Sequence, residues 1–132
     1  MKRRTKAVLL VAIALLCIPA LWIGARFSTV ERRGWRLFEA SLRGDLLAIK
    51  FMVWLGTDVN YVTGSGGAMH GAAFTGRTDI MEFLYRHGAQ IDAPAKFGVT
   101  PLYEAHMYHQ PAAERWLIAH GASTDFSHIN PP

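Results

Sequence analysis

The chain has 132 residues, 51% hydrophobic and 18% charged, which describes one small folded domain and excludes a disordered protein, a barrel enzyme or a two-domain binding protein. The net charge of +4 comes from four basic residues before residue 7, whereas residues 37–132 carry six basic and nine acidic residues. Because an acidic body has little attraction for phosphate backbones, no nucleic-acid partner is expected.

Residues 1–25 are predicted to be a transmembrane anchor or a signal peptide. The basic head MKRRTK precedes residues 7–25, a run of 19 residues without a charged side chain. As a helix this run would span about 28 Å, close to the roughly 30 Å hydrocarbon core of a bilayer. Its length favours an uncleaved single-pass anchor with the carboxy-terminal domain outside the cytoplasm. Cleavage after Ala20 or Ala25 is the alternative and would give a secreted or periplasmic protein.

Residues 26–36 form a basic connector. The capping-box spacing of Ser28 and Glu31 predicts that a helix starts there. The arginines of the connector would suit an anionic lipid surface, and a solvated linker is an equally good interpretation. Cys17 is the only cysteine, so the fold has no intramolecular disulfide.

Residues 37–128 contain an internal repeat with a period of 32 or 33 residues. The first block of each unit is an apolar segment that contains an alanine, where a small side chain lets helices approach closely. This block ends at a turn residue. The aligned positions are Phe38, His70 and Tyr103, then Ala40, Ala72 and Ala105, and then Gly44, Gly76 and His109.

A second block recurs in step and predicts a second helix in each unit. Asp45 can support the start of such a helix, Pro111 suits a first turn, and Gly88 and Gly121 suit the position that ends it. Two rows of apolar residues are expected to stack from unit to unit. These rows are Phe51, Phe83 and Trp116, and Met52, Leu84 and Leu117.

These units resemble the ankyrin repeat. The match is carried by GVTPLYEA at 98–105 with AHGAS at 119–123, and by GAMHGAAFTG at 67–76. The resemblance implies an all-α ankyrin-repeat stack at 37–128, behind one amino-terminal membrane helix and before a tail at 127–132. The three repeats are expected at about 34–61, 66–93 and 98–126, the first being degenerate. The resemblance also implies that His70 forms hydrogen bonds within its repeat.

The resemblance implies that loop tips and the inner helix face contact a protein partner. Several of the residues at these positions are aromatic or methionine, which are enriched at interfaces, although they would equally suit a small core or the covered ends of the stack. The predicted protein-binding residues are Leu42, Arg43, Phe74, Thr75, Lys96, Phe97, Val99, Met107 and Tyr108. Trp35 and Trp54 raise the same question in the first unit.

The sequence gives little support for a nucleotide-binding, metal-binding or catalytic site. Residues 71–78 imitate a phosphate-binding loop, but Arg77 replaces the lysine and no strand precedes the segment, so no nucleotide is expected. His106 and His109 provide one ligand pair, whereas zinc sites use three or four ligands. His87 and His120 suit interactions with the last carbonyls of a helix. The carboxylates, including Glu104, are expected on a solvated surface.

The sequence therefore predicts a membrane-tethered protein-binding module that is not an enzyme and has no catalytic residues, cofactor or metal. It would act by docking a partner on a rigid concave surface. An immunity factor or accessory subunit of a secreted or periplasmic enzyme, and a histidine-based metal or haem binder, are the alternatives.

Overall fold

The computed structural model describes residues 29–129. The chain divides into two compact units, Met1–Glu31 and Arg32–Pro132, and almost all of the described residues belong to the second. Among the described residues, no helix is both long and apolar enough to span a bilayer. The predicted anchor or signal peptide at 1–25 and Ser28 of the predicted capping box lie outside the described residues.

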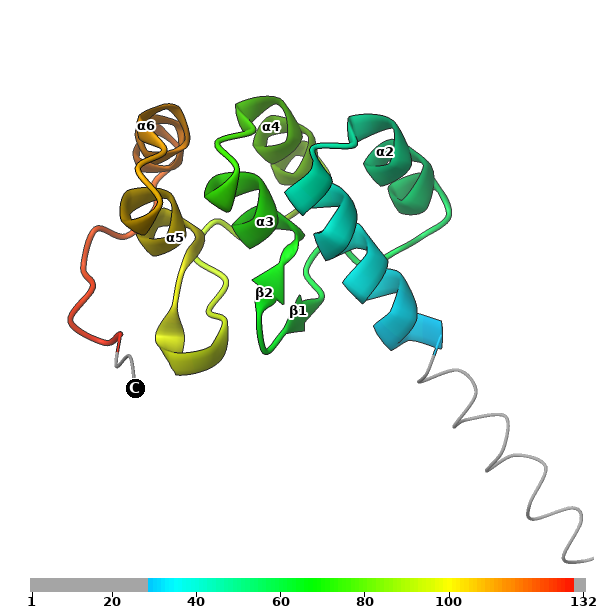
Figure 1. Ribbon diagram of the computed structural model, residues 1–132, viewed down its shortest axis with the longest axis horizontal. Helices are drawn as coiled ribbons and strands as arrows, with labels where there is room; N and C mark the ends of the chain where they lie inside the picture. The colour runs from blue at the N-terminus through cyan, green and yellow to red at the C-terminus, as the bar shows by residue number, and fades with distance from the viewer. Residues whose placement is uncertain (1–28, 130–132) are drawn as a thin grey trace, which may run out of the picture. The chain divides into compact units, whose positions relative to one another are not determined.

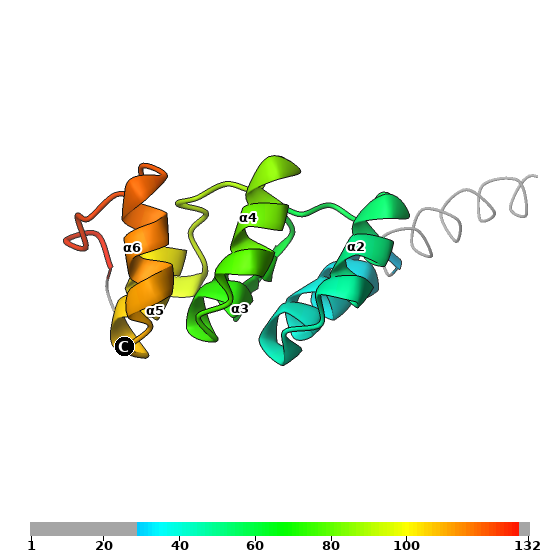
Figure 2. The ribbon, with the colours of Figure 1, turned by 90° about the horizontal axis from the view of Figure 1, so that it is seen from above.

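The second unit is a row of paired helices (Figure 1). A helix over residues 29–43 is followed by α2 (Leu46–Trp54), α3 (Ala68–Phe74) by α4 (Thr78–Arg86), and α5 (Pro101–Met107) by α6 (Pro111–Ala119). Seen from above, α2, α4 and α6 lie side by side (Figure 2). The helix 29–43, α3 and α5 form an inner layer between these outer helices and the connecting loops.

Both connecting loops project from the same side of the row (Figure 1). The first contains a two-stranded antiparallel hairpin, β1 (Val62–Thr63) and β2 (Gly66–Gly67), in which Val62 pairs with Gly67. The second contains a short 3-10 turn, η1 (Lys96–Gly98), closed where the Ala95 N–H donates to the Val99 carbonyl at 2.8 Å. The fold is therefore helical apart from this minimal hairpin.

Local sequence explains where the helices begin and turn. The Asp45 carboxylate accepts the Ala48 N–H at 2.9 Å and caps α2, and Pro111 occupies the first turn of α6. The turn between the helices of each pair has a left-handed residue at one repeat position, Gly44, Gly76 or His109. The third turn keeps this conformation (φ 53°) although histidine has a Cβ that disfavours it.

Polar side chains join neighbouring repeats at a regular spacing. The Asn60 amide donates to the Gly88 carbonyl at 2.9 Å and accepts the Gln90 N–H at 2.8 Å. One repeat later, the Asp92 carboxylate accepts the Ser123 N–H at 3.1 Å. These bonds fix each repeat against the next on the loop side of the outer helices.

The core is a continuous row of apolar residues through the three repeats. Ala40, Ala72 and Ala105 are fully buried, which confirms that the inner helices meet at small residues. Leu84 and Leu117 are also fully buried, and Met52 packs against the same cluster. One of the two predicted rows is thereby confirmed.

The other predicted row is wrong at its first member. Phe83 and Trp116 pack against the core, but Phe51 is 59% exposed. The reason is that Ile49 and Met52 turn α2 toward the core and leave Phe51 on the opposite side. Leu47 and Trp54 are both 78% exposed on the same helix, so α2 carries an apolar outer stripe.

Candidate functional site

A hollow of about 360 Å³ lies on the inner helix layer and draws residues from all three repeats. We call it the inner groove. Its lining residues are Trp35, Phe38, Leu42, Ser65, His70, Gly71, Phe74, Glu104 and Tyr108.

The floor of the inner groove is formed where two helices approach closely. A Cβ placed on Gly71 would lie 3.1 Å from Ser41 Cβ and 3.2 Å from the Phe38 carbonyl oxygen. Glycine therefore allows α3 to pack directly on the helix 29–43. The Ser41 hydroxyl is itself occupied, because it donates to the Leu37 carbonyl at 2.9 Å.

Aromatic rings form the walls of the inner groove. Phe74 of α3 and Tyr108, which follows α5, have ring centroids 4.2 Å apart at an interplanar angle of 58°. Trp35 and Phe38 form a second pair at 5.6 Å. Phe74 is 36% exposed and Tyr108 is 53% exposed. These rings thus hold one another in place and still present apolar surface to solvent.

His70 is a buried, fully bonded member of the floor. Its Nδ1 accepts the Gly67 N–H at 3.2 Å, which assigns the ring proton to Nε2, and Nε2 donates to the Val99 carbonyl at 3.1 Å. Burial lowers the pKa of His70, so the ring is neutral at pH 7. The expectation that His70 forms hydrogen bonds within its repeat is confirmed for Gly67, whereas the bond to Val99 reaches the next repeat. Neither ring nitrogen is available to a metal.

Glu104 is a half-buried carboxylate in this apolar setting. It belongs to α5, and no other described residue forms an ion pair or hydrogen bond with its side chain. Burial raises the pKa of Glu104 above the ordinary glutamate value, because the charged form loses hydration. The prediction that the carboxylates lie on a solvated surface is therefore wrong for Glu104.

The structure brings together three of the predicted protein-binding residues. Leu42, Phe74 and Tyr108 line the inner groove. Arg43 and Thr75 have local partners instead. Arg43 pairs with Glu39 at 3.6 Å, and the Thr75 hydroxyl donates to the Gly71 carbonyl at 2.9 Å.

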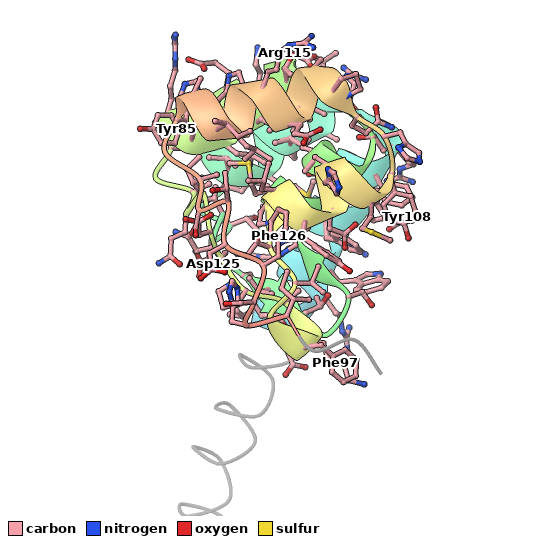
Figure 3. All side chains as sticks on the ribbon, turned by 90° about the vertical axis from the view of Figure 1, so that its left-hand side faces the viewer. Tyr85, Phe97, Tyr108, Arg115, Asp125 and Phe126 are labelled. Atoms are coloured by element: carbon pink, nitrogen blue, oxygen red, sulfur yellow. The ribbon has the colours of Figure 1, made fainter. Side chains whose placement is uncertain are left out.

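The remaining predicted residues lie outside the lining of the inner groove. Met107 is exposed on α5, and Lys96, Phe97 and Val99 belong to the second connecting loop. Figure 3 shows Tyr108 beside α5 and Phe97 apart from it at the tip of that loop. The Lys96 ammonium lies 4.7 Å from the centre of the Phe97 ring, so these two side chains form a separate exposed unit.

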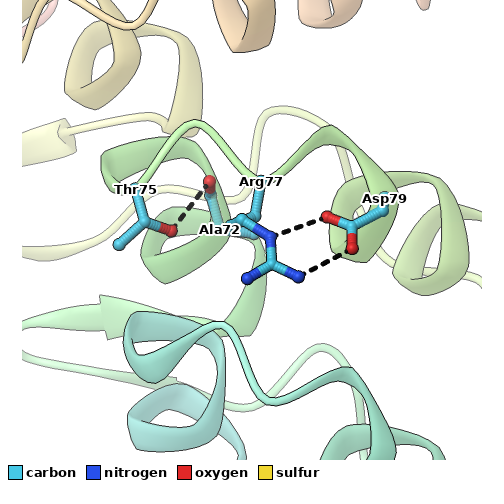
Figure 4. A network of polar contacts seen from close by, with 4 residues as sticks. All are labelled: Ala72, Thr75, Arg77 and Asp79. Atoms are coloured by element: carbon cyan, nitrogen blue, oxygen red, sulfur yellow. Dashed lines mark hydrogen bonds and ion pairs between the residues drawn. The ribbon is translucent and has the colours of Figure 1, made fainter.

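Residues 71–78 resemble a phosphate-binding loop because they contain the end of α3 and the start of α4. The Arg77 guanidinium donates two hydrogen bonds to the Asp79 carboxylate, at 2.9 and 2.8 Å, and Thr75 donates to the Ala72 carbonyl (Figure 4). This pairing lowers the pKa of Asp79. The cation that would face a phosphate is therefore already neutralised within the turn.

The other histidines have local partners or are dispersed. His87 and His120 each place Nδ1 at 2.7 Å from the carbonyl four residues earlier, which confirms their predicted role at helix ends. His106 lies 3.2 Å from Glu114 beside a shallow hollow that His109 also lines. Among residues 29–129, no group of three histidine, cysteine or carboxylate side chains is arranged to hold a metal ion.

Sequence reasoning missed Glu104 as a groove residue, and a signal for it existed. Glu104 precedes Tyr108 by four residues, a spacing that places both on one helix face. The repeat period also equates Glu104 with Glu39, and Tyr108 with Arg43. Glu39 thus has a cation one helical turn later, whereas Glu104 has a tyrosine there.

Comparisons with known proteins agree with this architecture. A family model described as ankyrin repeats in three copies matches residues 37–128. The crystal structure of the human ASB11 ankyrin repeat domain is similar with a TM-score of 0.66 and 31% identity, over 73% of this chain and 44% of that one. Serine/threonine-protein kinase 12 of Arabidopsis thaliana is 33% identical over 90 residues, which are 67% of this chain and 20% of the kinase. The chain thus spans less than half of either relative.

Proposed function

The chain belongs to the ankyrin-repeat family, and we propose that it acts as a protein-binding module without catalysis of its own. The inner groove is the surface on which a partner docks. The observation that carries this proposal is the pair formed by Phe74 and Tyr108, two neighbouring aromatic rings that remain partly exposed in a groove shared by three repeats.

The physical basis is the burial of an already ordered aromatic surface. Exposed aromatic side chains in a concave site gain free energy when a partner excludes water from them, and such residues dominate the energetics of interfaces. Because Phe74 and Tyr108 already pack on each other, binding immobilises little that was mobile before. A few anchors of this kind suit a stack of only three repeats.

Crosslinking from within the inner groove tests this proposal. Tyr108 is replaced by the photoreactive residue p-benzoylphenylalanine, and Arg115 is replaced in the same way as a matched control. Arg115 is exposed on α6 and labelled far from Tyr108 in Figure 3. We expect irradiation of cells to join one protein to position 108 and not to position 115. Equal crosslinking at both positions, or none at position 108, would contradict the proposal.

The captured protein then allows a quantitative prediction. The double substitution Phe74→Ala with Tyr108→Ala should weaken its binding at least about thirtyfold, because the loss of one interface anchor alone costs about 2 kcal/mol or more. Isothermal titration calorimetry with the full chain measures this change. Thermal unfolding serves as the control, since both rings are partly exposed and the variant should stay folded.

We further infer that residues 1–25 tether the module to a membrane, with the repeats on the non-cytoplasmic side. The uncharged run at 7–25 behind a basic head supports this arrangement. The exposed apolar stripe of α2, with Leu47 and Trp54, also suits a location beside a bilayer.

Fractionation and reporter fusions test the tether. The full chain should stay in the membrane pellet after alkaline carbonate extraction, and a carboxy-terminal alkaline phosphatase should be active. A soluble product shortened at its amino terminus would support the cleaved alternative. An inactive phosphatase together with a fluorescent carboxy-terminal green fluorescent protein would contradict the proposed topology.

A further inference from the structure

The inner groove contains a carboxylate without a cationic partner. The equivalent carboxylate in another repeat has such a partner. In the first repeat, Glu39 pairs with Arg43 one helical turn later, at 3.6 Å. In the third repeat, the equivalent residues are Glu104 and Tyr108. The third repeat thus has the acidic residue of this pair but a tyrosine in place of the basic residue.

The surroundings of Glu104 provide no substitute within the described residues. Of the residues that line the inner groove, only His70, Glu104 and Tyr108 have ionisable side chains. His70 already uses both ring nitrogens and is neutral. Among the described residues, Glu104 is therefore the only carboxylate that lines the inner groove, and no lysine or arginine lines it.

We propose that the inner groove binds a partner segment through one arginine or lysine side chain, whose cation pairs with Glu104. This inference rests on the proposed function and names the chemistry of the partner. The aliphatic stem of the basic side chain would lie against Phe74 and Tyr108, and the cation would reach the carboxylate at the groove wall. Aromatic rings add to this preference, because their faces attract cations.

The burial of Glu104 makes such a contact selective. A half-buried carboxylate forms a stronger bond with a cation than an exposed one does, because water competes less for both groups. An apolar side chain in the same place would leave the carboxylate without hydration or a partner, which is unfavourable. A partner with an acidic side chain there would be repelled. The site therefore discriminates between partners by charge as well as by shape.

The size of the inner groove limits what can enter it. A volume of about 360 Å³ lies at the lower end of the roughly 300–1,000 Å³ typical of ligand sites. This space accommodates one or two side chains and not a folded domain. A short segment with a basic residue between apolar residues matches both the volume and the aromatic walls.

Selection from a random twelve-residue peptide library on phage, with the full chain as bait, tests the proposal. We expect enrichment of peptides with one arginine or lysine next to apolar residues. A selected peptide, made synthetically, should bind Glu104→Gln at least about tenfold more weakly, since a hydrogen bond to a charged group is lost. Replacing the basic residue of the peptide by methionine should have a similar effect on wild type and little further effect on Glu104→Gln.

The matched control is Glu39→Gln. Glu39 occupies the same repeat position but does not line the inner groove, so peptide binding should not change. Glu104→Gln removes a carboxylate with an unfavourable environment, so thermal unfolding should show a variant at least as stable as wild type.

Two results would overturn the inference in different ways. In the first result, peptide binding depends on Phe74 but shows no preference for a basic residue and does not change in Glu104→Gln. This result would refute the cation pairing and leave the proposed function standing. Failure to enrich any peptide, or peptides whose binding is unchanged in Phe74→Ala, would refute the inner groove as a docking surface and the inference with it.

Discussion

His70 shows how a single buried residue joins two repeats. Its ring accepts from Gly67 in its own repeat and donates to the Val99 carbonyl in the loop of the next repeat. Protonation of Nδ1 would replace an acceptor by a second donor facing the Gly67 N–H. Burial disfavours the charged ring and lowers the pKa of His70, and it outweighs the hydrogen bond to the Val99 carbonyl, which raises that pKa. Folding is therefore linked to a neutral histidine.

This linkage predicts that the stack loses stability in mild acid. Because the folded pKa of His70 lies below the unfolded value of about 6.5, the unfolded chain binds more protons once the pH falls below that value. The free energy of unfolding should be constant above about pH 7.5 and should fall as the pH drops below about 6.5. Urea titrations of the full chain between pH 5 and 8 measure this dependence. His70→Asn should be less stable at pH 8 but should lose much less stability on acidification, and an equal loss in both proteins would contradict the role given to His70.

At the scale of the helix and the turn, most of the predicted features follow from the local sequence. The left-handed turns at Gly44 and Gly76, the Asp45 cap and the proline at the start of α6 follow from backbone and hydrogen-bonding rules that involve only neighbouring residues. Even the turn at His109 was located, because the repeat period places it in register with two glycines.

Helix α2 shows where local pattern was insufficient. Nearly all of its residues are apolar, so the sequence has no polar face that would tell which side is buried. Packing decides instead, with Ile49 inward and Phe51 outward. The inner groove was only half predicted for a similar reason. Leu42, Phe74 and Tyr108 could be inferred from family positions, whereas the burial of Glu104 depends on three helices that meet only in the folded stack.

The whole molecule is a short stack in which each repeat is completed by its neighbours. The middle repeat contributes to both interfaces of the row, because Gly71 of α3 packs against the helix 29–43 on one side, while α3 contacts α5 and α4 contacts α6 on the other. A single repeat cannot bury its apolar sides, and stacked repeats share one continuous core. A stack of only three repeats has little stability to spare. A substitution in the core of the middle repeat should therefore destabilise both outer repeats.

Leu84→Ala tests this dependence. Leu84 is fully buried in α4, and its truncation should cost about 2–5 kcal/mol, because a cavity remains in a core that the outer repeats share. We expect one cooperative urea transition at lower concentration, with the same midpoint for fluorescence from tryptophans in the first repeat and for fluorescence from Trp116 in the third. Variants that retain one tryptophan separate these signals. Leu47→Ala is the matched control, since Leu47 is 78% exposed and its loss should cost less than about 0.5 kcal/mol. A shifted midpoint for one end with an unchanged midpoint for the other would show that the repeats unfold independently, and the stack would then be a chain of separate units.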